Sequence, residues 1–344
     1  MKNPIAILLF IALSSGAPAQ KLRRAIAAAD LVVVATSMRV IPTKTHTIHR
    51  LKIEELLRGP VGFDLSQVSI VVTKRVAVHN RPVAAKRMIY CLHDYAKSAR
   101  SAKLPGNFAP YYKMSGYAGS GVVLDKKPTK DPRLAFARVL IDSQKGQSSR
   151  KTTEALFSIA LTGDKRIRTE AASSLAERQA LITCLTKMHL NKLLARAVAE
   201  TEDIGYKIEL ASICAMRKVA SLIPTLCLSV EHVGDHGFLR ALGRFAQYIH
   251  GEEAAEILSN HASRARGKTR DRLIVALGAT ASDGALKTLL AMQKRGQDKA
   301  AVETALRIHG SPRATAAVAS KAAKSDKKGI QKSDEKGRKS PRQP

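Results

Sequence analysis

The chain has 344 residues, of which 45% are hydrophobic and 4% are aromatic, and its formal net charge is +30. This length favours two domains, and so few aromatics favour cores of Ala, Leu, Ile and Val, which suits helix-on-helix packing. Four irregularly spaced cysteines exclude a disulfide framework. The charge predicts attraction to polyanions, although solvated Lys and Arg side chains explain the same excess.

The N-terminal residues have the features of a secretory signal peptide. Lys2 precedes an apolar run from Ile5 to Leu13, and the small residues Ala17-Pro18-Ala19 follow. The run is too short to span a bilayer, and no Cys follows it as a site for lipid attachment. We predict a signal peptide over residues 1–19 and an exported, periplasmic or extracellular mature chain. A retained membrane anchor is the alternative.

Residues 20–125 are predicted to form a small, basic, β-rich domain. A short helix in KLRRAIAAAD precedes five expected strands, at 31–40, 45–57, 66–78, 84–92 and 120–124. The first strand begins with a continuous, β-branched apolar run, as in a well-buried strand. The Gly- and Pro-rich residues 104–121 predict a long loop. Five short strands separated by turns indicate a small barrel or sandwich.

The order of these segments resembles the netrin-like, OB-type barrel of exported bacterial proteins. The matching pieces are AADLVVVATSMRV, LKIEELLRGP, VSIVV and RMIYCL. Metalloproteinase-inhibiting members of this family use an N-terminal cysteine, whereas the mature chain here would begin near Gln20. Cys91 is the single cysteine of residues 20–125, so the family's disulfides cannot form. The resemblance therefore implies the barrel but not metalloproteinase inhibition.

A charged segment with two prolines, DKKPTKDPR, predicts a linker over residues 126–133. Residues 134–320 are helical in pattern. Residues 321–344 contain one apolar residue besides alanine, and are predicted to be a disordered basic tail.

The helical region contains a degenerate repeat. Its spacing is marked by Leu175, Leu242, Leu277 and Leu306. A period near thirty residues, with two helices in each unit, predicts an α-solenoid. A non-repeating helical bundle is the alternative.

One unit resembles the short, lyase-type HEAT repeat, whose pattern reads D-x-x-v-R-x-x-A-a-x-a-L-g. The matching residues are Asp164, Ile167, Arg168, Ala171, Ala172 and Leu175. Asp164 can cap the start of this helix. The resemblance implies five or six stacked helix pairs.

No motif predicts catalysis, a cofactor or a metal. GKT at 267–269 lacks the earlier glycine of a phosphate-binding loop, and Ser120 lacks the glycine of a nucleophile elbow. His46 and His49 are expected on opposite faces of a strand. His232 and His236 are expected to be exposed in a turn.

Three further groups have open interpretations. Glu54 and Glu55 are expected to begin a solvated helical turn, and they would point to opposite faces if the strand continued through them. Cys214 and Cys227 flank a predicted turn near 218–221, and are either buried thiols or a disulfide. The aromatics of the long loop either cover the open end of the barrel or form a stacking or ligand-contact surface, and these are Phe108, Tyr111, Tyr112 and Tyr117.

These patterns predict an exported, non-catalytic binding or scaffold protein whose solenoid contacts an acidic protein partner. An anionic envelope polymer or a lipid surface are alternative partners, and nucleic acid is not expected. The binding residues are not identified, and Arg240 and Arg244 are placed on an exposed helix side as a first test. The alternative function is an enzyme or enzyme inhibitor whose activity resides in the β domain. A lyase-like action on a tetrapyrrole–cysteine adduct is suggested by the repeat type alone, and predicted export argues against it.

Overall fold

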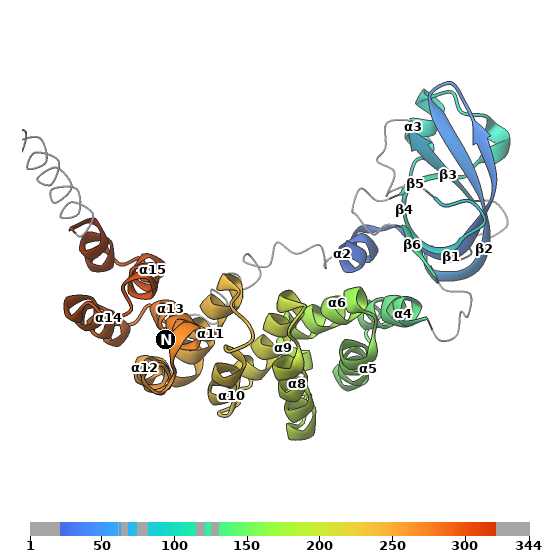
Figure 1. The fold of residues 1–344 in the computed structure, drawn as a ribbon. Helices are drawn as coiled ribbons and strands as arrows, with labels where there is room; N and C mark the ends of the chain where they lie inside the picture. The colour runs from blue at the N-terminus through green and yellow to red at the C-terminus, as the bar shows by residue number, and fades with distance from the viewer. Residues whose placement is uncertain are drawn as a thin grey trace, which may run out of the picture. The chain divides into compact units, whose positions relative to one another are not determined.

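A computed structural model describes residues 21–60, 62, 68–73, 82–114, 121–124 and 131–320 (Figure 1). The predicted signal peptide, the predicted tail and most of the predicted linker lie outside these ranges. The described part of the chain contains a small β-barrel followed by a helical region, which confirms the predicted two-part architecture. Contacts divide the chain into two compact units, whose described residues are 21–189 and 190–320. This boundary lies within the helical region, whereas the sequence suggested one at 126–133.

The barrel is built from one curled sheet. Its strands are β1 (Leu31–Pro42), β2 (His46–Arg58), β3 (Val68–Thr73), β4 (Arg87–Asp94), β5 (Tyr111–Met114) and β6 (Gly121–Val123). The strand order is β1-β2-β3-β5-β4, and β4 pairs again with β1 to close the ring. The β3–β5 pairing is parallel, and the other pairings are antiparallel. β6 adds to β4 beside β5.

The strand that completes the ring, β5, was not predicted. It lies within residues 104–121, which the sequence indicated as loop, so that part of the prediction was wrong. β5 pairs with β3 through Tyr111 and Tyr112 and with β4 through Tyr112 to Met114. Four residues among glycines and prolines carry little periodicity, and the pairing partners on both sides decide the strand.

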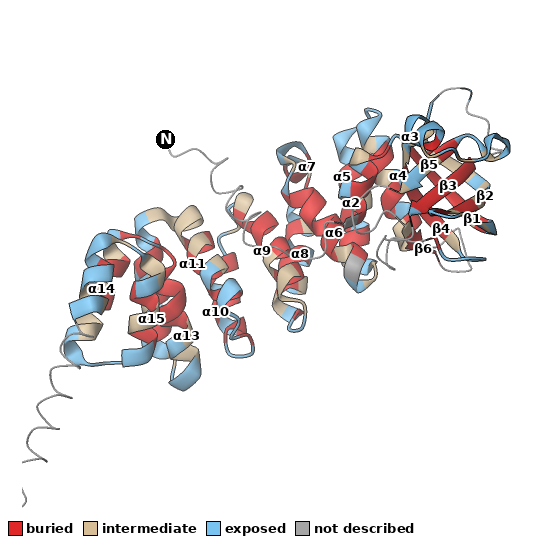
Figure 2. Ribbon diagram, turned by 90° about the horizontal axis from the view of Figure 1, so that it is seen from above, coloured by how far each residue is buried: buried red, intermediate tan, exposed pale blue. Residues whose placement is uncertain are grey.

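The first five residues of β1, 31–35, are buried on both faces of the strand, which explains their continuous apolar sequence. Leu31, Val33 and Ala35 point into the barrel core with residues of the other strands. Val32 and Val34 alternate with them and are also fully buried. Buried residues follow the strands of the barrel and the inner sides of the helices (Figure 2).

The helix that precedes the barrel, α2 (Lys21–Ala28), docks on a later helix of the same unit. Glu170 lies on α6 (Lys165–Ala176) and is buried, and its carboxylate accepts the backbone N–H groups of Leu22 at 3.4 Å and Arg23 at 3.0 Å. Arg23 also forms an ion pair with Glu177. A carboxylate at the first turn of a helix satisfies donors that have no partner inside the helix. The start of the barrel domain and the first helices are therefore held together.

The remaining helices are α3 (Ala96–Ser101), α4 (Pro132–Gln144), α5 (Ser149–Thr162), α7 (Gln179–Thr183), α8 (Lys187–Ala199), α9 (Ile204–Met216), α10 (Leu222–Ser229), α11 (His236–His250), α12 (Ala254–Arg264), α13 (Gly267–Gly278), α14 (Asp283–Arg295) and α15 (Lys299–His309). In the second unit, α9, α11, α13 and α15 pack successively as one layer, and α12 packs on α14 in another. This alternation of helices between two layers is a solenoid-like arrangement.

An aspartate begins four of the described helices. Asp131, Asp164, Asp203 and Asp235 each accept a backbone N–H from their own first helical turn, at 2.8 to 3.1 Å. The helices that they cap are α4, α6, α9 and α11. Capping satisfies one donor at each helix start, so the same short sequence signal recurs with the same physical role.

Glycine at two equivalent positions permits close helix contact. Gly243 on α11 faces the carbonyl of Ala276 on α13, and Gly278 on α13 faces the carbonyl of Ala305 on α15. A Cβ built on either glycine would lie 2.1 or 2.3 Å from that oxygen. Each follows one of the repeat-marking leucines, Leu242 and Leu277. The Leu-Gly pair therefore combines a buried side chain with a close backbone approach.

Candidate functional site

Lys207 on α9 is the described residue with the strongest features of a chemically active group. Its side chain is completely buried. Burial lowers its pKa to about 8, and the opposing effect of Glu200 is smaller. Lysines with a lowered pKa serve as bases or nucleophiles in many enzymes, so its surroundings decide its role.

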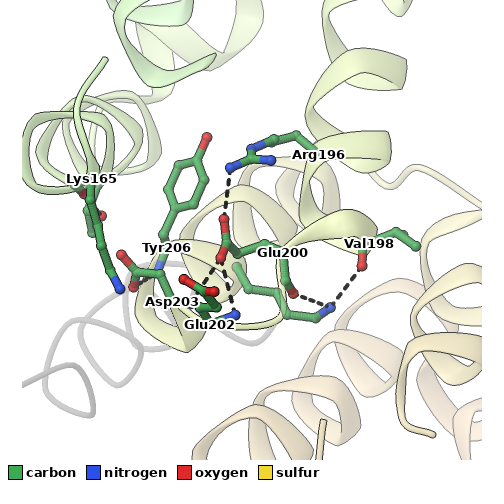
Figure 3. Close-up of polar contacts among 9 residues, drawn as sticks. Lys165, Arg196, Val198, Glu200, Glu202, Asp203 and Tyr206 are labelled. Carbon is green, nitrogen blue, oxygen red and sulfur yellow. Dashed lines mark hydrogen bonds and ion pairs between the residues drawn. The ribbon is translucent and has the colours of Figure 1, made fainter. Parts of the chain in front are cut away.

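The Lys207 ammonium is used by the fold. Nζ donates hydrogen bonds to the carbonyl oxygens of Glu200 at 3.1 Å and Val198 at 3.4 Å, where α8 ends (Figure 3). It also lies 5.0 Å from the ring centroid of Phe238 on α11. These contacts satisfy carbonyls at a helix C-terminus and add a cation–π interaction. The lysine therefore ties α8, α9 and α11 together.

The turn between α8 and α9 is organised by the side chain of Glu200. Its carboxylate accepts backbone N–H groups from Glu202 at 3.2 Å and Asp203 at 3.0 Å. The same carboxylate pairs with Arg196 at 2.9 Å (Figure 3). The Arg196 guanidinium lies 5.8 Å from the ring centroid of Tyr206. The cluster has the properties of a buried polar network that sets the geometry of a turn.

Sequence reasoning missed this cluster. Its only local signal is Lys207, which lies with Glu209 in a largely apolar helix, a position where a charged residue needs partners. Those partners come from α8 and α11. A helical pattern alone cannot tell whether a lysine in it reaches solvent or a helix end.

The histidines singled out from the sequence, His46, His49, His232 and His236, do not form a metal site among the described residues. His46 is buried with its ring centroid 6.5 Å from that of Tyr95, and His49 Nδ1 lies 3.1 Å from the Ser37 hydroxyl. Across the described ranges, no three His, Cys, Asp or Glu side chains come together as a metal site would require. His232 and His236 are exposed.

Glu54 and Glu55 lie in β2, so the expectation of a helical turn there was wrong. Each carboxylate has its own arginine: Glu54 pairs with Arg87 at 2.5 Å and Glu55 pairs with Arg138 at 2.8 Å. β2 continues through both residues because it pairs with β1 from Thr47 to Arg58, with a register shift at Glu54. Separate partners are not the arrangement of an acid–base pair.

The aromatics of residues 104–114 contribute to cores. Tyr111 and Phe108 pack with Ile48 and Val71, on the outer side of β2 and β3. Arg50 donates to the Asn107 carbonyl at 3.3 Å and lies over the Phe108 ring. Tyr112 packs against the barrel core, and Tyr117 lies outside the described residues. These rings therefore cover the side of the barrel.

All four cysteines are free thiols. Cys214 and Cys227 are buried, which supports the interpretation as core residues rather than as a disulfide. Burial raises the pKa of both to about 12. Burial also raises the pKa of Cys91 to about 12, and the Glu170 carboxylate adds to the shift. Thiols with such pKa values stay protonated and unreactive at neutral pH.

The two arginines chosen from the sequence differ in exposure. Arg240 is exposed, as expected, whereas Arg244 is partly buried. Burial lowers the pKa of Arg244, and the neighbouring Arg240 adds to that effect. Arg240 is therefore the better surface position of the two.

Comparison of the chain with protein-family models, with curated proteins and with solved structures returns no significant match. Within the described residues, no helix has both the length and the apolar character needed to cross a membrane. The function is therefore argued from the geometry of the chain itself.

Proposed function

We propose that this chain is an exported, non-catalytic binding or scaffold protein that contacts a protein partner through its stacked helices. The observation that carries the proposal is the layered packing of α9, α11, α13 and α15, each on its neighbour. Such stacking produces an extended surface, which repeat proteins use for recognition. Lys207, whose pKa burial lowers to about 8, donates hydrogen bonds to the end of α8 and so holds helices together. This structural role supports binding rather than catalysis as the function.

The helix pairs are assigned to short HEAT-like repeats. Support comes from Asp164 and Asp235, each of which caps a helix and is followed three residues later by a buried apolar side chain, as in the D-x-x-v part of that pattern. The barrel is assigned to an OB-type, netrin-like fold. Its five-stranded closed ring with a strand order of 1-2-3-5-4 supports this assignment.

Oligonucleotide binding by the barrel is not part of the proposal. OB-folds bind such ligands on the face formed by strands 2 and 3. Here the corresponding residues Ile48 and Val71 are covered by the chain's own Ala99, Leu104 and Phe108. Export, proposed from residues 1–19, argues in the same direction.

Cross-linking of the intact chain in its native cells, followed by mass spectrometry, tests the proposed function. We expect cross-links from lysines of the helices in residues 190–320 to a defined partner. Cross-links confined to the barrel would favour the alternative of an enzyme or inhibitor centred there. A turnover activity retained after substitution of the exposed helix residues, such as Arg240→Glu, would also contradict a pure binding role.

A further inference from the structure

Two neighbouring loops of the second unit carry a cluster of exposed cations. The loop between α12 and α13 contributes Arg264, Arg266 and Lys268, and the loop between α14 and α15 contributes Lys294, Arg295 and Lys299. All six side chains belong to exposed residues. We name these six residues the basic edge.

The two loops lie side by side. α12 packs on α14 and α13 packs on α15, which brings the connections between these helices to the same edge. Arg270, in the first turn of α13, binds Asp298, just before α15, at 2.9 Å. This ion pair joins the loops and engages one of the two carboxylates in these segments, the other being the exposed Asp271. The basic edge therefore retains a large excess of positive charge.

A cavity opens beside the second loop. It has a volume of about 250 Å³ and is lined by Lys294, Lys299 and Val302, and by Ala317 and Ser320 of the following helical segment. Its one acidic lining residue, Glu303, pairs with Arg307 at 2.8 Å. The edge thus combines positive charge with a concave site where a partner side chain fits.

Along the edge formed by these connections, the positive charge is concentrated at one end. The corresponding turns before α9 and α11 are acidic, with exposed Glu202, Glu231 and Asp235. A solvated surface of a basic protein would carry cations at all of these turns alike. Their segregation points to an electrostatic role for the basic edge.

We propose that the basic edge docks an acidic, extended segment of a partner protein, with one carboxylate side chain entering the cavity between Lys294 and Lys299. This rests on the binding role proposed above and assigns its site. The arginine side chains of the basic edge can bind carboxylates in bidentate fashion, and its lysines provide further positive charge.

Two other polyanions fit the surroundings less well. Residues 264–320 contain no Phe, Tyr or Trp on which the bases of a nucleic acid would stack. The exposed large apolar residues of the described chain also lie outside 264–320, with Leu228 the nearest in sequence. A membrane-bound surface normally carries such side chains for insertion.

The test measures binding of a fluorescein-labelled oligoglutamate peptide to the full chain by fluorescence anisotropy. The edge variant carries Arg264→Glu, Arg266→Glu and Lys268→Glu. The matched control carries Lys192→Glu, Arg217→Glu and Lys218→Glu, which are exposed residues of the same unit and give the same change in charge. We expect the edge variant to bind at least about tenfold more weakly, and the control to change by less than about threefold. Circular dichroism establishes that both variants fold.

Equal weakening in both variants would show that net charge, and not the basic edge, attracts the peptide, and would overturn the proposal. The proposal would also fail if the full chain never bound oligoglutamate, while the edge variant lost binding to an oligothymidine or to phosphatidylglycerol vesicles. The basic edge would then bind nucleic acid or lipid. Native cross-links that map to another helical surface would contradict the assignment of the binding site to the basic edge, but would leave the proposed binding role in place. Absence of cross-links from the helices would count against the binding role itself.

Discussion

Replacement of Gly243 or Gly278 by alanine tests whether the Leu-Gly pairs set the distance between stacked helices. In a free helix, alanine is favoured over glycine by about 1 kcal/mol. Here the new Cβ of Gly243→Ala would lie 2.1 Å from the Ala276 carbonyl oxygen, and that of Gly278→Ala 2.3 Å from the Ala305 oxygen. Backbone atoms cannot swing aside, so α11 and α13, or α13 and α15, must separate by about 1 Å.

The expected result is a net loss of stability. Overpacking of a well-packed core costs about 1–3 kcal/mol, which offsets or exceeds the propensity gain of about 1 kcal/mol. Each variant should therefore lose up to about 2 kcal/mol of stability, a decrease in Tm of up to roughly 6 °C for a cooperative unit of this size. Differential scanning calorimetry of the full chain and urea unfolding followed by circular dichroism measure the change.

Gly284→Ala on α14 is the matched control. Its new Cβ would meet only the Ala255 side chain, at 3.4 Å, which is close to ordinary contact. That substitution should be neutral or raise stability by up to about 1 kcal/mol. If Gly243→Ala and Gly278→Ala stabilised the protein as much as the control, the close-approach argument would be refuted.

Three further predictions concern the buried Lys207, the capping Glu170 and the N-terminal cleavage site. The pKa of Lys207 is about 8 in the fold against 10.5 ordinarily, so between these values the unfolded state binds more protons and stability rises with pH. Relative to Lys207→Met, the native chain should gain about 1 kcal/mol between pH 7 and 9, and parallel urea-unfolding profiles would contradict this. The comparison with Lys207→Met is needed because burial raises the pKa of three thiols. Their contribution lowers the stability of the protein as pH rises above about 9. Glu170→Ala should destabilise the first unit by about 1–3 kcal/mol because two N–H groups of α2 lose their acceptor. The control, Glu154→Ala at an exposed position, should cost less than about 0.5 kcal/mol. Equal decreases in Tm for the two variants would refute the capping role of Glu170. Intact mass and N-terminal sequencing of native protein should show cleavage after Ala19, and a mature chain that begins at Met1 would exclude it.

Several features of the fold were accessible from the sequence because they depend on local periodicity. The continuous apolar run of β1 identified a strand buried on both faces, and Asp164 with Ile167, Ala171 and Leu175 identified a capped helix with one buried face. Recurrence of the same signals predicted the helical region after a β-rich start. These patterns report which side chains avoid water, and this property is encoded in residue spacing.

Other features depended on partners distant in sequence. β5 lies among glycines and prolines, and β3 and β4 on its two sides make it a strand. Glu54 and Glu55 continue β2 because β1 pairs with it there. No local pattern could indicate these pairings, because the free energy that favours them comes from hydrogen bonds to other segments.

The polar contacts show most clearly which features the local sequence determines and which depend on distant partners. The sequence by itself determined that Lys207 lies in a largely apolar helix, close to Glu209, and that Glu170 lies in a helix with several alanines. Only the tertiary structure decided that Lys207 binds the end of α8 and that Glu170 caps α2, which begins about 150 residues earlier. A buried charge is stable only with partners, and the three-dimensional path of the chain selects which partners arrive.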